Sequence, residues 1–239
     1  MKRDRRLFLE VSAAVALGVL PLAGRTAGAG SVRTKIGIVG SGRVGGTLGG
    51  VWAKAGHQVM FSSRDLAHDK ALAASLGPNA RAGTPREAAA FGEALMISVP
   101  YGALPQVGKD LAGLLKGKVV IDTCNPFPSR DGEVATWARE KGAGLASAEL
   151  LPGARIVRAF NAIGYSRMGE AHEQPGRIGM PIAGDDAQAV ELASRLIRDI
   201  GYEPVLIGGL AMGRHLMPGT PLAGEHTPQE IRRIAATLR

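Results

Sequence analysis

A short apolar run that leads directly into a glycine-rich turn is the feature that most constrains the fold of this chain. Residues Lys35–Val39 have the composition of a buried β-strand, and the next six are Gly40, Ser41, Gly42, Arg43, Val44 and Gly45. Apolar residues then recur at helical spacing, at Leu48, Val51 and Trp52. In such a unit the first glycine permits a tight turn, the second leaves bare backbone for a phosphate, and the third lets helix and strand pack closely. The pattern predicts a diphosphate-binding turn.

The same residues come close to a second phosphate-binding pattern, the G-x-x-x-x-G-K-T loop of nucleoside triphosphatases. Gly46 stands where that loop requires a lysine, so the cation that reaches the terminal phosphates is missing. A strand before the turn, a helix after it and a second strand over Gln58–Ser62 match instead the G-x-G-x-x-G turn of dinucleotide-binding folds. The expected ligand is therefore a dinucleotide.

Beyond the turn, short apolar runs alternate with helical patterns, which is typical of βαβ units and a mainly parallel sheet. Seven strands are predicted, over Lys35–Val39, Gln58–Ser62, Ala94–Val99, Val119–Asp122, Arg155–Phe160, Ile178–Ala183 and Pro204–Ile207. We expect an α/β fold with a doubly wound, mainly parallel sheet (Rossmann-like) and a small C-terminal α/β extension. The predicted domains are a nucleotide-binding domain over 30–165 and an extension with a tail helix over 166–239.

Helix boundaries are marked by capping patterns. Thr84 and Thr227 are each followed by a proline and, three residues later, by a glutamate, which predicts two helix starts. Gly77 and Gly117 are expected at helix ends. The last helix carries an apolar stripe that either docks on the body of the protein or forms a subunit interface. A homodimer is therefore an open alternative.

Residues 1–29 have the pattern of an export signal. Four basic residues at positions 2, 3, 5 and 6 precede an uncharged stretch over 11–23, which is too short to span a membrane as a helix. The segment around Arg5 and Arg6 resembles a twin-arginine signal, and small residues before Gly30 suit a signal peptidase. We expect cleavage after Ala29 and an exported, periplasmic protein that is soluble without a stable membrane anchor. An ordinary secretory signal or a misplaced start is the alternative.

Charge and composition exclude several other classes of protein. The chain has 239 residues, of which 45% are apolar and 21% charged, so it resembles an ordinary globular protein. The net charge of +8 falls to +5 without residues 1–29, which hold five basic and two acidic side chains. The remaining charge is dispersed, so nucleic-acid binding is not expected. One Cys and five scattered His give no metal-binding spacing, and no metal is predicted.

The end of the second strand bears on which dinucleotide binds. An acidic residue there would accept a hydrogen bond from the ribose 2′-hydroxyl of NAD. Ser63 and Arg64 stand there instead, and a hydroxyl beside a guanidinium suits the 2′-phosphate of NADP. Asp65 is the neighbour that favours NAD, and a capping role for Ser63 is the structural alternative. NADP is the expected cofactor.

Together these stretches resemble the NADPH-dependent reductases of the deazaflavin coenzyme F-420. The similarity covers residues 34–218 and rests on the glycine turn with Ser63-Arg64, on Val99-Pro100-Tyr101, on residues 122–126 and on residues 157–161. The same fold occurs in the nucleotide domain of membrane metalloreductases. His68 departs from the family pattern, where a lysine is frequent, and Met217 replaces a frequent glutamate.

The resemblance implies roles for particular residues. Ser41, Gly42, Arg43 and Val44 would hold the diphosphate, Ser63 and Arg64 the 2′-phosphate, and Val99, Pro100 and Tyr101 the nicotinamide side of the site. Ligands of open α/β sheets bind at the carboxyl ends of the strands, where these groups fall. Asn125 and Asn161 end two further strands, so Tyr101, Asn125 and Asn161 are candidates for the catalytic cleft, with a satisfied loop side chain as the alternative for either asparagine.

The chemistry implied by the resemblance needs few catalytic side chains. Hydride transfer between nicotinamide and a deazaflavin is a direct carbon-to-carbon step without an acid–base pair. No Tyr is followed four residues later by a Lys, the pattern of one class of carbonyl reductase. Cys124 has no basic neighbour in sequence, so we expect a buried apolar residue rather than a redox-active thiol.

We therefore expect an NADP(H)-dependent oxidoreductase that transfers a hydride between nicotinamide and a small-molecule acceptor, a deazaflavin (coenzyme F-420) or a flavin-like compound. Two alternatives remain. One is a non-catalytic NADP-binding or sensing protein, which needs the turn but no second pocket. The other is an imine reductase similar to pyrroline-carboxylate reductase, whose catalytic half is a long helical domain, whereas this chain carries strand patterns after Asn161.

Overall fold

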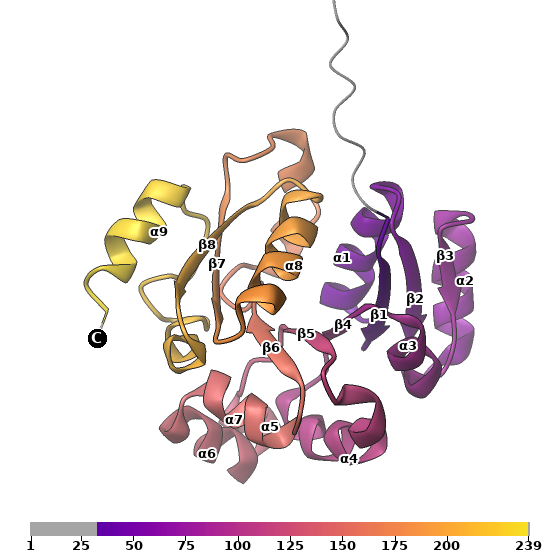
Figure 1. Ribbon diagram of the computed structural model, residues 1–239, viewed down its shortest axis with the longest axis horizontal. Coiled ribbons are helices and arrows are strands. Elements are labelled where there is room, and N and C mark those ends of the chain that lie inside the picture. The colour runs from indigo at the N-terminus through magenta and orange to yellow at the C-terminus, as the bar shows by residue number, and fades with distance from the viewer. Residues whose placement is uncertain (1–32, 239) are drawn as a thin grey trace, which may run out of the picture. The chain divides into compact units, whose positions relative to one another are not determined.

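The computed structural model describes residues 33–238 (Figure 1). The expected export signal at residues 1–29 lies outside these residues. The described strands form one eight-stranded sheet in the order β3-β2-β1-β4-β5-β6-β7-β8. They are β1 Lys35–Val39, β2 Gln58–Ser62, β3 Ala80–Ala82, β4 Ala94–Ile97, β5 Val119–Asp122, β6 Arg155–Arg158, β7 Gly179–Gly184 and β8 Glu203–Gly208.

Helices connect the strands and cover both faces of the sheet. The α-helices are α1 Arg43–Lys54, α2 Leu66–Leu76, α3 Pro85–Phe91, α4 Leu104–Leu115, α5 Pro128–Asp131, α6 Glu133–Lys141, α7 Ala143–Leu150, α8 Ala187–Arg198 and α9 Pro228–Ala235. The described residues also form the 3-10 helices η1 Tyr101–Ala103, η2 Tyr165–Arg167, η3 Ala171–Glu173 and η4 Leu210–His215. This arrangement confirms the doubly wound, mainly parallel fold.

The sheet is parallel from β3 to β6 and then reverses. Val157 of β6 lies opposite Gly184 of β7 in an antiparallel pair, while β7 and β8 are parallel to each other. Residues 166–239 therefore contribute their strands to the same sheet as the nucleotide-binding unit. Because β7 and β8 run the other way, their carboxyl ends lie at the edge opposite to the carboxyl ends of β1 and β4–β6.

Two apolar cores lie on the two faces of the sheet. On one face, α1, α2 and α8 cover alternate strand residues, and Phe160 lies edge-on to Trp52 and Tyr202 with ring centroids 6.3 and 5.6 Å apart. On the other face, residues from α3, α4, α6 and α7 pack on the intervening strand positions. Along β4, Met96 points to the first core and its neighbours Leu95 and Ile97 to the second, as the two-residue period of a strand requires.

The predicted strand bounds hold where apolar pattern and hydrogen bonding coincide. β1, β2 and β5 have the predicted bounds, whereas β4 and β6 each end two residues early, at Ile97 and Arg158. Strand β3 was not predicted, because its three residues, Ala80–Ala82, are too few to show an apolar period. Its backbone pairs with β2 at the edge of the sheet.

The predicted helix boundaries are confirmed. Capping boxes at Thr84 and Thr227 begin α3 and α9, and Gly77 is the C-cap of α2. Gly117 follows the C-cap of α4 with a φ of +73°. These capping signals depend on residues that are adjacent in sequence, so they predict helix ends without knowledge of the tertiary contacts.

The tail helix α9 docks on the body of the protein. Ile231 is fully buried with Leu216 and Leu222 in a third apolar cluster beside β7 and β8. The segment before α9 also returns to the rest of the sheet, because Arg158 Nη2 donates to Leu216 O at 3.4 Å and Gly224 N donates to Ala162 O at 2.8 Å. Among residues 33–238, no helix is both long and apolar enough to cross a bilayer.

Candidate dinucleotide-binding site

The turn between β1 and α1 can be built only with glycine at its first and last positions. Gly40 has a φ of +99°, and a Cβ there would lie 2.1 Å from Ser98 O at the end of β4. A Cβ at Gly45 would lie 2.0 Å from Gly40 O. Both glycines are therefore explained by packing within the protein, as the sequence pattern predicts.

Gly42 has no such explanation within the protein. It is exposed, it is the N-cap of α1, and a Cβ there would meet nothing within 4 Å. Its φ of −67° is open to any residue. The space beside Gly42 is therefore bare backbone facing outward, the condition that a bound diphosphate requires.

The start of α1 provides donors for an anion at the same place. The first helical hydrogen bond runs from Gly46 N to Gly42 O at 2.7 Å, so the preceding amides have no acceptor within the helix. Partial positive charge at a helix N-terminus adds to these amides. The exposed Arg43 side chain contributes a full charge; its Nη1 donates to Tyr165 Oη at 3.2 Å, and its guanidinium lies 5.0 Å from the Tyr165 ring centroid.

Ser41 has a different environment from the one the sequence suggests. Its side chain is 2% exposed, its N–H donates to Ser62 O at 3.2 Å, and its hydroxyl donates to Asp69 Oδ1. Both of its donors are thus used inside the protein. Ser41 shapes the turn, and the free donors for a diphosphate begin at Gly42.

The end of β2 carries the residues expected at the 2′-phosphate. Arg64 is exposed, and Ser63 is half-buried with its hydroxyl 2.9 Å from Asp69 Oδ2. Asp65, rather than Ser63, caps α2, since its carboxylate accepts from His68 N at 2.9 Å. Asp69 is fully buried on α2 and was not predicted, because no sequence motif marks its contacts with Ser41 and Ser63.

In the segment after β4, Val99 is partly exposed and Pro100 is exposed. Tyr101, the next residue, is fully buried. Tyr101 Oη lies 3.1 Å from Ala143 O and 3.1 Å from Ser147 Oγ, both on α7. Burial is the main cause that raises the pKa of this phenol well above its ordinary value. Tyr101, which was expected in the cleft, is therefore a core residue, because its side chain packs against α7.

Asn125 and Asn161, which follow neighbouring strands, are brought together. Asn125 Nδ2 donates to Asn161 O at 2.7 Å, and Asn161 Nδ2 donates to Cys124 O at 3.4 Å. Asn161 is 2% exposed, yet its Oδ1 has no hydrogen-bond partner within residues 33–238. Just before it, Phe160 adopts a φ of +65°, a strained conformation that fixes the direction of the chain at the end of β6.

A buried ion pair supports this edge of the sheet. Asp122 and Arg158 end β5 and β6, are fully buried, and have Oδ2 and Nη1 2.6 Å apart. Arg158 Nη2 also donates to Cys124 O at 3.1 Å. Cys124 is buried, as the sequence predicts, and burial raises the pKa of its thiol well above its ordinary value.

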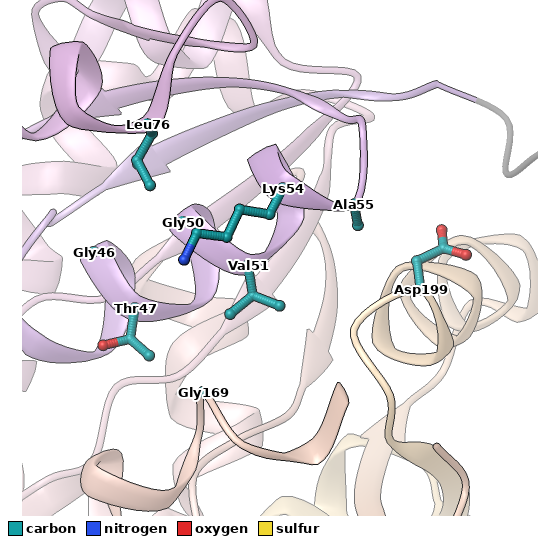
Figure 2. A pocket seen from close by; sticks show the side chains of 9 residues that line it. All are labelled: Gly46, Thr47, Gly50, Val51, Lys54, Ala55, Leu76, Gly169 and Asp199. Atoms are coloured by element: carbon teal, nitrogen blue, oxygen red, sulfur yellow. The ribbon is translucent and has the colours of Figure 1, made fainter. Parts of the chain in front are cut away.

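A hollow of about 520 Å³ runs along α1, outside the residues described above (Figure 2). Figure 2 shows Thr47, Val51 and Lys54 of α1 on one side and Gly169 and Asp199 on the other. It contains none of the predicted site residues. The candidate dinucleotide site, at the turn and the strand ends, thus lies outside this hollow.

The fold and the turn define a dinucleotide-binding protein of the Rossmann type. A family model described as NADP oxidoreductase, coenzyme F420-dependent, matches residues 35–126. The F420-dependent NADP reductase of Methanothermobacter marburgensis is 30% identical over 188 residues, which are 71% of this chain and 81% of that protein. The chain belongs to this family of NADP-dependent oxidoreductases.

Other similarities are more limited. Metalloreductase STEAP3 of Rattus norvegicus is 29% identical over 185 residues, 76% of this chain, but the chain spans only 35% of its length. A hypothetical protein from Sinorhizobium meliloti has a TM-score of 0.65 at 23% identity over 81% of this chain and 94% of its own. Mycobacterium tuberculosis 3-hydroxyisobutyrate dehydrogenase has a TM-score of 0.57 at 21% identity, and the match covers 76% of this chain and 57% of that protein. These two structures show a shared fold.

Proposed function

We propose that this protein binds NADP(H) at the turn between β1 and α1 and transfers a hydride between nicotinamide and a deazaflavin or flavin-like acceptor. The observation that carries the proposal is the combination at Gly42: open space, outward backbone and unpaired helix-start amides. The identity to an F420-dependent NADP reductase supports the choice of acceptor.

The residues present fit the cofactor. Amides of Gly42–Gly45 and the Arg43 guanidinium suit a diphosphate, and the exposed Arg64 suits a 2′-phosphate. Val99 and Pro100 lie after the neighbouring strand β4, on the side proposed for nicotinamide. Bound NADP(H) supplies the hydride chemistry, while the protein binds, orients and excludes water.

The polar groups next to this edge are arranged for positioning rather than proton transfer. Tyr101 and Cys124 are both buried with raised pKa values, so neither is suited to exchange a proton near neutral pH. Asn161 Oδ1 is a buried acceptor without a hydrogen-bond partner in the described part of the chain, so it is available to a donor of a ligand. We therefore propose that Asn125 and Asn161 orient the reacting rings. We also propose that the reaction is a direct transfer of hydride from ring to ring.

The binding half of the proposal is tested by substitution of Gly42. Because a Cβ at Gly42 meets no protein atom, Gly42→Val should fold normally and obstruct only a ligand. Gly113→Val, in α4, is the matched control, since a Cβ there also meets nothing within 4 Å. We expect calorimetry to show that Gly42→Val loses NADPH binding and Gly113→Val keeps it. Equal affinity in both variants would contradict the proposed site.

The catalytic half is tested by mixing NADPH-loaded protein with acceptors without oxygen. Coenzyme F420, a flavin, a quinone and a ferric chelate are offered separately while nicotinamide absorbance is followed. Fast oxidation with the deazaflavin or the flavin supports the proposal. Tight NADPH binding without oxidation by any of the four would indicate a binding or sensing protein instead.

A further inference from the structure

A fully buried carboxylate links the two loops that are proposed to hold the adenosine half of the cofactor. Asp69 of α2 accepts from the hydroxyl of Ser41 in the glycine turn and from the hydroxyl of Ser63 after β2. Burial of a carboxylate is costly unless hydrogen bonds compensate it, and these two hydroxyls are its side-chain donors. Asp69 is therefore part of how both loops are built.

The hydrogen bonds of Ser63 determine what its hydroxyl can offer a ligand. A hydroxyl has one proton, and three acceptors lie within reach of that of Ser63: Asp69 Oδ2 at 2.9 Å, Asp69 Oδ1 at 3.1 Å and the Asp65 carbonyl oxygen at 3.2 Å. The charged carboxylate is both the nearest and the strongest of them, so the proton points to Asp69. The Ser63 oxygen accepts from Asp65 N at 3.1 Å. Phosphate oxygens need donors, so Ser63 cannot donate to a 2′-phosphate while it donates to Asp69. One lone pair remains, which suits the proton of a ribose 2′-hydroxyl.

The charge of Asp69 acts in the same direction. A carboxylate within hydrogen-bond distance of Ser63 repels a 2′-phosphate and does not repel a 2′-hydroxyl. Arg64 has the opposite effect, because its exposed guanidinium attracts the phosphate. The two residues therefore have opposed effects on the choice between the two dinucleotides.

We propose that Asp69 is a selectivity-setting positioning residue that holds the Ser63 proton and so reduces the preference for NADP over NAD. The inference rests on the proposed function, since it concerns the same site. It implies that the protein retains measurable affinity for NAD, and that Arg64 alone provides the preference for the phosphorylated cofactor.

The test compares dissociation constants for NADPH and NADH in the wild-type protein, in Asp69→Asn and in Asp110→Asn. We expect Asp69→Asn to tighten NADPH binding by about threefold to tenfold and to change NADH binding by less than about twofold. Asp110→Asn is the charge-matched control, because Asp110 lies on α4, on neither of the two loops, and its carboxylate accepts from Gln106 Nε2 at 2.7 Å. A similar change for both nucleotides, or an equal shift in Asp110→Asn, would overturn the proposal.

A double variant tests the route through Ser63. If Asp69 acts in part by holding the Ser63 proton, the gain in NADPH affinity should be smaller when Asp69→Asn is combined with Ser63→Ala, because only the effect of the lost charge then remains. Full persistence of the gain would overturn this route. Thermal unfolding checks that each variant is folded, and Asp69→Ser replaces Asp69→Asn if the latter is not.

The outcomes separate this inference from the function on which it rests. Wild-type protein that binds neither nucleotide would contradict the proposed function. Wild-type protein that binds NADPH and NADH with a ratio unmoved by Asp69→Asn would contradict only the role of Asp69.

Discussion

Asp122 and Arg158 face each other as direct neighbours on the parallel strands β5 and β6 and form an ion pair from which solvent is fully excluded. A pair of this kind is hard to replace one partner at a time, because the remaining charge is left buried. Each partner lies three residues before one of the two asparagines proposed to orient the reacting rings. The stability of the fold and the geometry of the site thus depend on the same contact.

Arg158→Met should therefore destabilise the protein strongly, by about 3–5 kcal/mol in the free energy of unfolding, because the Asp122 carboxylate loses its partner. Urea denaturation at neutral pH measures this change. Arg155→Met is the matched control on the same strand, since Arg155 pairs with the half-exposed Asp186 and its loss should cost far less. Equal losses in the two variants would show that the buried pair has no special role.

Arg64→Ala should weaken NADP binding by about 1–3 kcal/mol and leave NAD binding nearly unchanged, because one charged partner of the 2′-phosphate is removed. Calorimetric titration with both nucleotides measures the two changes. Arg139→Ala, on α6, removes the same charge far along the chain and should affect neither. A parallel loss for NADP and NAD would make Arg64 a structural residue.

Stability should fall as the pH drops below about 6.5 because of His57. This ring is fully buried, its Nδ1 accepts from Thr34 N at 3.2 Å, and its Nε2 lies 3.1 Å from Asp199 Oδ2. Burial lowers its pKa, and the nearby Asp199 opposes that shift only in part. The unfolded chain therefore binds the proton first, so stability present above the ordinary pKa is lost as pH falls toward the folded-state pKa.

Denaturation curves between pH 7.5 and 5, at intervals of about half a unit, would show this dependence. The His57→Gln variant should be less stable at pH 7.5 but flatter across the same range. If wild type and variant have parallel pH profiles, another group is responsible.

We also propose export of the folded protein by the twin-arginine route, which Arg5 and Arg6 suggest. In a bacterial host, the full chain should reach the periplasm with NADP bound, and the Arg5→Lys, Arg6→Lys double variant should remain in the cytoplasm. Cell fractionation and assay of released nucleotide measure both outcomes. Periplasmic protein without nucleotide would contradict loading before export, and equal distribution of both forms would contradict the route.

The sequence predicts those parts of the fold that depend on patterns of a few adjacent residues. The glycine turn, β1, β2 and β5, and the capping boxes at Thr84 and Thr227 each occupy a few adjacent residues, and each is found where expected. The short edge strand β3 has no such pattern, since its pairing with β2 supplies the order that its three residues lack.

The details of the site depend on neighbours that are distant in sequence. Asp69 reaches Ser41 across 28 positions, and Arg158 meets Asp122 across 36, and neither contact has a motif. Tyr101 shows the reverse case, because its position after β4 was predicted while the turn η1 buries its side chain against α7.

Because the sheet reverses direction between β6 and β7, the edge that carries Asn125 and Asn161 is built from parts of the chain that are distant in sequence. Strand β8 ends at the opposite edge of the sheet, so the chain has to return after it. The segment from Leu216 to Gly224 makes this return and hydrogen-bonds to Arg158 and Ala162. A truncation after Gly208 would leave the residues of the glycine turn in place. It would remove the segment that contacts Arg158 and Ala162, the neighbours of Asn161. The proposed nucleotide site and the proposed acceptor site thus draw on different parts of the chain.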